Sequence, residues 1–409
     1  MNIERFLKQP SAWAPREPAG DAAISSRIRL ARNLKECAFP GWAAEEECVR
    51  VWDLLRETLV QCATLDEAVT ESMENLSGLD KQILFERHLI SREHADRKNG
   101  SGVVIRADEE VAVMVNEEDH LRLQSMRAGL DLENAWKAVT ALDDEIEQTV
   151  DYAFSPNYGY LTACPTNVGT GMRASVMLHV PGLVLMGEMN AVVKGMSKIG
   201  LAVRGLQGEG SEAAGNMFQV SNQMTLGERE EDIIRNLEKI VLEILEHESN
   251  ARGRLLESNE ARVQDLVGRA LGILSNAHIL SSKETLDLLS DLRLGIDMGI
   301  VSLRNNAVVN ELLVLMQPGH LQKMQGRRLN AMERDISRAR LVRTRMQKEL
   351  KKTGKKNEYL YAKSATGTAT GQKRGRSVQS GIRGHRAPAV GADRPGAGGR
   401  GQRDDPYGH

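Results

Sequence analysis

The alternation of apolar and polar positions divides the chain into a mixed first part and a helical second part. Between about residues 22 and 250, short apolar and β-branched runs at 103–105 and 111–115 flank an acidic turn and predict two strands. We read the short apolar runs SVMLHV and LVLMGEMNAVV in the same way. The stretches LENAWKAVTALDDEIEQTVDYAF and EREEDIIRNLEKIVLEILEHES instead place apolar residues at helical spacing. This part of the chain predicts an α+β fold.

From about residue 253 the strand signals end. The segment SSKETLDLLSDLRLGI places Ser281 three residues before Glu284, a capping-box pattern, and continues with apolar residues at 286, 289, 292 and 296. The sequence QPGH interrupts the next helix, and LNAMERDISRARLVRTRMQKELKK predicts a last one. We expect an N-terminal extension over 1–21, a mixed domain over 22–252 and a small all-helical domain over 253–350.

Charge separates the last segment, 351–409, from the rest of the chain. The chain holds 54 Lys and Arg against 56 Asp and Glu; this segment holds 13 and 4 of them, which leaves 41 against 52 before it. Its 12 glycines and few large apolar side chains cannot offset ordering entropy by burial, so we predict disorder. We interpret this basic Gly- and Arg-rich tail as a solvated appendage and expect no direct nucleic-acid role.

Composition disfavours several classes of protein. No apolar run approaches the ~18–20 residues of a membrane helix, and the N-terminus lacks the basic and apolar regions of a signal peptide. We therefore expect a cytoplasmic protein without a membrane partner. The four cysteines, at 37, 48, 62 and 164, form no C-x-x-C pair, which disfavours a zinc site and a disulfide framework.

The stretch GTGMRA, beginning at Gly169, fits the dinucleotide fingerprint G-x-G-x-x-A. That fingerprint requires a following helix, whose N-terminus binds the pyrophosphate. Here ASVMLHVP follows, which alternates like a strand and ends in proline. The stretch therefore predicts a loop of small residues that presents Arg173 at the start of a strand.

Other stretches also present arginines. SSRIRLARN places Arg27 and Arg29 two residues apart, hence on one side of a strand, and Arg122 and Arg204 lie in VNEEDHLRL and VRGLQGEGSE. An arginine keeps its charge and grips two oxygens at once, so several converging arginines would suit a polyphosphate. Taken singly, each of these residues is better explained by a surface ion pair.

Taken together, SSRIRLARN, NEEDHLR, CPTNVGTGMRAS and RGLQGEGSE resemble, in order and spacing, the motifs of the phosphagen kinases. The resemblance covers about residues 22–250 and implies a catalytic domain with an antiparallel sheet flanked by helices. The protein-arginine kinase branch is the most similar, because RDISRA, beginning at Arg334, matches its helical-domain motif. The small-molecule branch carries a helical domain before the first motif, where this sequence has 24 residues.

The resemblance implies that five arginines bind the phosphates of ATP: Arg27, Arg29, Arg122, Arg173 and Arg204. His88 resembles a nucleotide-contacting histidine of the family, although a structural histidine is an equal alternative. Gln207 stands where arginine kinases carry a further arginine, which leaves the number of phosphate-binding arginines open. The other residues implied at the nucleotide are Ser25, Ser26, Ile28, Ala174, Ser175, Val176, Met177, Gly205, Leu206, Gln207 and Gly208.

The acceptor needs carboxylates, because a guanidinium is protonated and a poor nucleophile until its proton is removed. Glu118 resembles the catalytic base, and both Glu209 and Glu212 are candidates for its partner. We interpret Glu117 and Asp119 as a solvated acidic turn. Cys164 resembles the reactive cysteine of the family, and we expect an orienting thiol whose pKa the cationic surroundings lower, not a covalent nucleophile.

In the helical domain, Arg334 and Arg338 lie four residues apart on one helix face. The resemblance implies an allosteric pocket for phosphoarginine formed by Arg334, Asp335, Arg338 and Ala339. The alternative is an Asp335–Arg338 pair on a solvated helix.

The resemblance implies an ATP- and Mg²⁺-dependent protein-arginine kinase without a metal site of its own, since Mg²⁺ is held mainly through ATP. The resemblance further implies that it marks stress-damaged, arginine-bearing proteins for a Clp protease and its ATPase. It also implies action on a heat-shock repressor, a zinc-binding activator protein and a homodimer formed through the helical domain. The alternatives are a kinase for a small guanidino compound and a non-catalytic phosphoarginine-binding adaptor.

Overall fold

The computed structural model describes residues 4–7, 11–14, 22–205 and 213–350. The tail predicted over 351–409, most of the N-terminal extension and the segment 206–212 lie outside the described residues. Within the described ranges, no helix is both long and apolar enough to cross a membrane.

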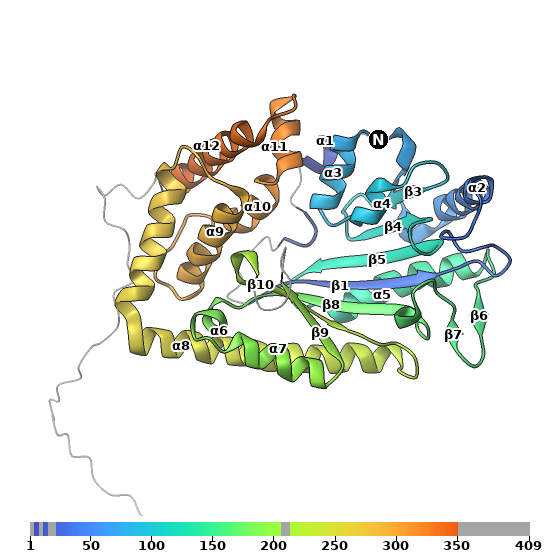
Figure 1. Cartoon of the computed structure of the whole chain (residues 1–409), viewed down its shortest axis with the longest axis horizontal. Helices are drawn as coiled ribbons and strands as arrows, with labels where there is room; N and C mark the ends of the chain where they lie inside the picture. Colours follow the sequence, from blue (N-terminus) through green and yellow to red (C-terminus); the bar gives the residue numbers. More distant parts are fainter. Residues whose placement is uncertain (1–3, 8–10, 15–21, 206–212, 351–409) are drawn as a thin grey trace, which may run out of the picture. The chain divides into compact units, whose positions relative to one another are not determined.

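An eight-stranded sheet forms the centre of the first part, in the order β2-β3-β4-β5-β1-β8-β10-β9 (Figure 1). Each strand pairs with its neighbours in antiparallel fashion, which confirms the predicted α+β class with an antiparallel sheet. A separate small hairpin joins β6 (Phe154–Ser155) and β7 (Gly159–Tyr160). The strands of the sheet are β1 (Ala23–Arg32), β2 (Val69–Ser72), β3 (Gly102–Ile105), β4 (Val111–Val115), β5 (Leu121–Ala128), β8 (Met172–His179), β9 (Leu201–Gly205) and β10 (Met217–Asn222).

Twelve α-helices accompany these strands in the described part of the chain. The run LVLMGEMNAVV, which we read as strand-like, is helical: Pro181 begins one short helix, and Gly187, with φ of 73°, separates it from the next. Short apolar runs do not distinguish a buried helix from a strand, which explains the error. The helices are α1 (Glu4–Leu7), α2 (Glu45–Gln61), α3 (Gly78–Glu86), α4 (Arg92–Asp96), α5 (Leu132–Glu147), α6 (Pro181–Leu185), α7 (Met189–Lys198), α8 (Glu230–Asn276), α9 (Ser282–Asp297), α10 (Val308–Leu315), α11 (Pro318–Gln325) and α12 (Ala331–Leu350).

The two faces of the sheet differ in chemistry because side chains alternate along each strand. On β1, Ile28 and Leu30 are buried in the main apolar cluster, which α5 and the first part of α8 complete. Arg27 and Arg29 therefore lie on the opposite face. The antiparallel register places Arg173 of β8 directly beside Arg29. Thus the alternation within RIRLAR, together with the strand order, collects arginines on one face of the sheet.

The helical second part begins within α8, which continues from the mixed domain to Asn276. Asn259 interrupts this helix with non-helical dihedral angles of φ −150° and ψ 42°. The predicted boundary between residues 252 and 253 thus falls inside one helix. The Ser281 side chain accepts a hydrogen bond from the Glu284 amide at the start of α9, which confirms the predicted N-cap.

Buried polar contacts connect the two parts. Glu86, the last residue of α3, accepts hydrogen bonds from the backbone amides of Gly319 (2.7 Å) and His320 (3.1 Å) at the start of α11. The His320 Nδ1 atom also lies 2.7 Å from this carboxylate. At the far end of β8, His179 Nε2 lies 2.8 Å from the Ser290 hydroxyl of α9. The helical part is therefore attached to the sheet at two places.

Arg32, at the end of β1, forms a buried ion pair beneath the sheet. Its guanidinium donates to the Asp143 carboxylate of α5 at 2.6 and 3.0 Å and to the Thr170 carbonyl at 2.8 Å. The Tyr152 hydroxyl donates to the other Asp143 oxygen, and the Tyr160 ring lies 3.5 Å from the guanidinium carbon. Because both charged groups of this pair are buried, loss of Asp143 leaves the Arg32 charge without its closest compensation.

We predict that Asp143→Asn lowers the free energy of unfolding by about 3–5 kcal/mol, because the Arg32 charge stays buried without its partner. Chemical denaturation of both forms measures this change. Glu133→Gln, which removes an exposed i,i+4 pair with Lys137, is the matched control and leaves the denaturation midpoint nearly unchanged. Equal, small effects of both substitutions would contradict the assignment of Arg32–Asp143 as a structural pair.

Candidate active site

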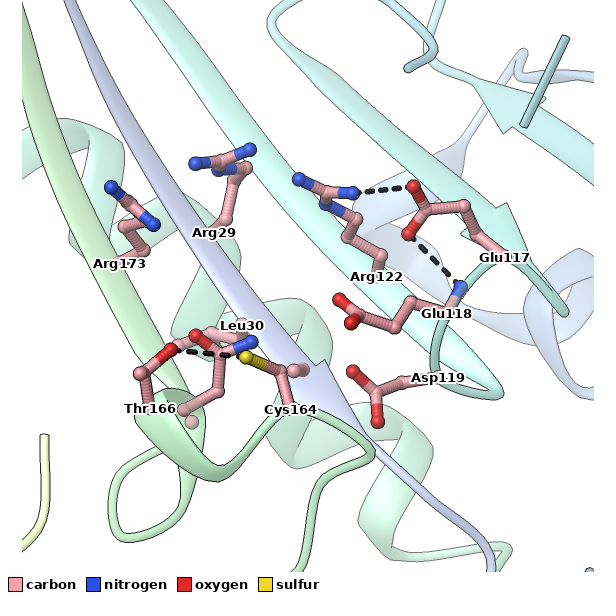
Figure 2. A pocket seen from close by; sticks show the side chains of 12 residues that line it. Arg29, Leu30, Glu117, Glu118, Asp119, Arg122, Cys164, Thr166 and Arg173 are labelled. Carbon is pink, nitrogen blue, oxygen red and sulfur yellow. Dashed lines mark hydrogen bonds and ion pairs between the residues drawn. The ribbon is translucent and has the colours of Figure 1, made fainter. Parts of the chain in front are cut away.

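A cavity of about 110 Å³ opens on the arginine-bearing face of the sheet (Figure 2). Arginines from β1, β5 and β8 form one wall, the acidic turn before β5 forms another, and the loop before β8 contributes a cysteine. The lining residues are Arg29, Leu30, Ala31, Glu117, Glu118, Asp119, Arg122, Cys164, Thr166, Asn167, Gly171 and Arg173. The fold therefore brings together residues from motifs that are far apart in the sequence.

The arginines of this face destabilise one another's charge. Burial, together with the charges of Arg122 and Arg173, lowers the pKa of Arg27 to about 10. Burial and the neighbouring arginines also lower the pKa of Arg29, and burial with Arg204 and Arg122 lowers that of Arg173. A bound polyanion would offset both the burial of the arginine charges and their mutual repulsion, because its negative charge lies close to them.

Glu117 is not the solvated residue that we predicted. Its side chain is buried and accepts hydrogen bonds from Arg122 Nη1 and the Ser91 hydroxyl, both at 2.6 Å. Burial alone would raise the pKa of Glu117, but the Arg122 charge and these hydrogen bonds outweigh it and lower the pKa to about 2. Glu117 therefore holds Arg122 in place as a permanent anion.

Asp119 is also buried, which corrects the second half of that prediction. Its Oδ1 atom accepts hydrogen bonds from the Asn33 amide at 2.6 Å and from the Ala163 backbone at 2.7 Å. Ala163 precedes Cys164, so Asp119 positions the loop that carries the thiol. Sequence reasoning missed Asp119 and Asn33 because both partners come from distant segments; the only signal was their position inside NEEDHLR and SSRIRLARN.

Glu118, between these two buried carboxylates, is exposed. Figure 2 shows its carboxylate directed toward the cavity between Arg122 and Asp119. Partial burial, followed by the charges of Asp119 and Glu117, raises the pKa of Glu118. A carboxylate with a raised pKa is a stronger base, which suits removal of a proton from an acceptor in the cavity.

Cys164 lines the same cavity as Glu118. Its Sγ atom lies 3.1 Å from the Thr166 hydroxyl, and the side chain is only partly buried. The structure thus brings Cys164, Glu118, Arg29, Arg122 and Arg173 around one space, as the motifs predicted.

A second cavity, of about 210 Å³, lies on the same face of the sheet. Ile28 alone separates Arg27, which lines this cavity, from Arg29, which lines the first. His88 adopts a left-handed conformation with φ of 60°, and burial followed by the Arg27 charge lowers its pKa to about 4. The lining residues are Trp13, Ser25, Arg27, His88, Met126, Ser175, Met177, Met217 and Gln219.

Several predicted nucleotide residues face away from both cavities. Ile28, Ala174 and Val176 are buried in the helix-covered cluster, and the Ser26 hydroxyl donates to the Gly129 carbonyl and accepts from the Asp131 amide. Alternation along β1 and β8 explains this, because only every second side chain reaches the arginine-bearing face.

The β9 strand and the segment after it complete the set of predicted residues. Arg204 is exposed on β9, opposite Gln219, and Gly205 ends the strand. Arg204 lines neither cavity. The remaining predictions, Leu206, Gln207, Gly208, Glu209 and Glu212, lie outside the described residues.

The predicted phosphoarginine residues lie on α12. Arg338 is buried: it donates to the carbonyls of Met316 (3.0 Å) and Leu280 (2.8 Å) and pairs with Asp335 at 2.5 Å. Ala339 is buried, whereas Arg334 is only partly buried and donates to the Leu329 carbonyl. The alternative of a solvated pair is therefore wrong for Arg338, whose guanidinium binds the C-terminal end of α10.

Two family models match the chain. The model described as ATP:guanido phosphotransferase, C-terminal catalytic domain, matches residues 51–251. The model described as protein-arginine kinase McsB C-terminal domain matches residues 260–358. The first match includes the cavity residues except those on β1, which carries Arg29. The second match includes α9 to α12.

Solved structures share the fold. A taurocyamine kinase from Schistosoma mansoni, with bound transition-state analogue components, aligns with a TM-score of 0.52 at 23% identity over 67% of this chain and 44% of its own. A lombricine kinase aligns with a TM-score of 0.50 at 21% identity over 62% of this chain and 71% of its own. These alignments confirm the phosphagen-kinase-like fold.

Curated relatives are much more similar in sequence. The protein-arginine kinase of Bacillus pumilus is 45% identical over 88% of this chain and 100% of the relative. Those of Halothermothrix orenii and Bacillus subtilis are 46% and 42% identical over 85% and 88% of this chain, and each is covered to 99%. With the cavity, the fold and both domain matches in agreement, the chain belongs to the protein-arginine kinases of the ATP:guanido phosphotransferase family.

Proposed function

We propose that this protein transfers the γ-phosphate of ATP to arginine side chains of proteins. The observation that carries this proposal is the single cavity in which Arg29, Arg122 and Arg173 face Glu118 and Cys164. Arginines suit the phosphates, and a basic carboxylate with a partly buried thiol suits a guanidinium. The names of the curated relatives support a protein-bound arginine as the acceptor.

The side chains of this cavity suit each step of the phosphoryl transfer. A guanidinium nitrogen of the acceptor forms a bond to the γ-phosphorus, and the bond from that phosphorus to the β,γ-bridging oxygen breaks, releasing ADP. Glu118 takes the proton that the nitrogen loses. Arg29, Arg122 and Arg173 stabilise the charge of the transferring group, and Glu117 keeps Arg122 in position for it.

The acidic side chains near the cavity indicate how Mg²⁺ would be bound. Within the described ranges, no group of three or more Asp, Glu, His or Cys residues is arranged to hold a metal ion. Glu117 is paired with Arg122, and Asp119 is paired with Asn33 and Ala163, so both are already in use. We therefore propose that Mg²⁺ arrives on the phosphates of ATP, where it neutralises charge.

Other roles are proposed from the family resemblance of the motifs. The 22–252 and 253–350 segments act as the catalytic and the phosphoarginine-sensing domains, and the second forms a homodimer in the cytoplasm. Modification marks stress-damaged proteins for a Clp protease and acts on a heat-shock repressor, with a zinc-binding activator protein. Arg334 and Asp335, which are only partly buried, are the accessible members of the proposed sensing pocket.

The deciding experiment compares two acceptors. The protein is incubated with ATP and Mg²⁺ and either free arginine or an unfolded arginine-rich protein, and acid-labile, base-stable phosphate is measured on each. We expect phosphate on the protein acceptor only. Phosphate on free arginine would favour a small-molecule guanidino kinase, and ATP-independent binding of phosphoarginine without any transfer would favour an adaptor.

Glu118→Gln is expected to lower kcat by about 10²–10⁴-fold with little effect on ATP binding, because it removes the base and not a phosphate ligand. Single-turnover phosphorylation and equilibrium ATP binding measure the two quantities. Glu57→Gln, at an exposed position of α2, is the matched control and retains full activity. Separate Glu209→Gln and Glu212→Gln variants identify the partner of Glu118 by the larger loss of kcat.

The pH profile tests the electrostatics of the turn. A base acts only when ionised, so kcat/KM falls as pH drops through the pKa of Glu118, which lies above the ordinary value for a glutamate. Glu117→Gln removes a neighbouring negative charge and also frees Arg122, so it moves this acidic limb to lower pH and reduces kcat. A limb that stays in place or moves to higher pH would contradict the coupling of Glu117 to Glu118.

A further inference from the structure

The second cavity contains an aromatic side chain that no motif assigns. Trp13 belongs to the short described segment 11–14, before the first arginine motif, and its side chain lines the cavity together with His88 and three methionines. The residue is 7% exposed, so most of its surface is packed inside the protein. Aromatic rings and polarisable methionines form an apolar surface suited to a flat ligand.

Buried charges hold Trp13 against His88. The Ser11 hydroxyl donates to Glu109 Oε2 at 3.4 Å, and the same carboxylate accepts from Arg87 at 2.9 and 2.6 Å. Because Arg87 precedes His88, one buried ion pair positions both aromatic walls. The Trp13 and His88 ring centroids lie 5.1 Å apart in an edge-to-face arrangement, with an interplanar angle of 61°.

Two further properties point to a planar, neutral ligand with hydrogen-bond acceptors. The lowered pKa of His88 keeps its ring neutral near pH 7, so this wall packs on an aromatic ring without presenting a charge. The buried indole Nε1–H of Trp13 has no hydrogen-bond partner among the described residues. Burying an N–H group without a hydrogen-bond partner costs free energy, and a phenylalanine would pack here without that cost because it has no donor.

The position of the cavity identifies the ligand class. Arg27 lines this cavity and Arg29 lines the phosphate cavity, one strand residue apart. We propose that Trp13 is a binding residue for the purine base of ATP, which packs against the adjoining indole and His88 rings while the phosphates reach Arg29. This inference rests on the proposed use of ATP and adds the residue that selects its base.

The test measures binding directly and not phosphorylation. Trp13→Leu keeps apolar bulk but removes the aromatic ring, and Trp42→Leu, at a side chain that is 91% exposed, is the matched control. Calorimetry is performed with ATP and with inorganic tripolyphosphate, which has no base. We expect Trp13→Leu to weaken ATP binding about 10-fold, as loss of base stacking does, with tripolyphosphate binding unchanged.

Trp13→Phe separates a base contact from a packing role. It keeps a ring and is expected to bind ATP more tightly than the leucine variant. Wild-type ATP affinity in Trp13→Leu would overturn the proposal, and so would an equal loss of ATP and tripolyphosphate, since that indicates a collapsed site. If the wild-type protein binds ATP but modifies no arginine, the proposed function fails while the base contact stands.

Discussion

Repulsion between arginine side chains gathered on one face of the sheet is the constraint on which the rest of this site depends. Arg27, Arg29 and Arg173 are at least partly buried and so close that burial and mutual repulsion lower the pKa of each. A fold holds such a cluster only when apolar burial elsewhere supplies the stability. Here α5 and α8 cover the opposite face of the same strands, so the sheet is stabilised from one side and carries charge on the other.

Buried acids make this arrangement specific. Glu117 compensates Arg122 inside the site, whereas Asp143 compensates Arg32 beneath the sheet, and each holds its arginine in one orientation. Arg29 and Arg173 form no such pair in the described structure and remain suited to a ligand's negative charge. Arg32, paired beneath the sheet, is thus structural, whereas Arg122 is held by Glu117 at the cavity wall beside the unpaired Arg29 and Arg173.

The two cavities lie next to each other along β1 and differ in chemistry. Arg29 belongs to the cavity with Glu118 and Cys164, where charge and proton transfer are possible, and Arg27 belongs to the aromatic and methionine-lined cavity. Trp13, Met126 and Met217 of the second cavity pack in the same apolar cluster as α9, α10 and α12. A ligand in that cavity would therefore contact side chains that also support the helical domain.

The sequence by itself determined the α+β class, the strands at 103–105 and 111–115, the Ser281 cap and the motifs that carry the arginines, because these depend on local spacing and chain chemistry. It could not distinguish Glu117 and Asp119 from a solvated turn, since their burial depends on Ser91, Asn33 and Ala163 in other segments. It also made residues 183–193 resemble a strand although they are largely helical, because a short apolar run is compatible with either structure. Only the tertiary structure placed Trp13 beside His88, since the contacts of Ser11 and Arg87 with the buried Glu109 carboxylate, not sequence distance, bring those rings together.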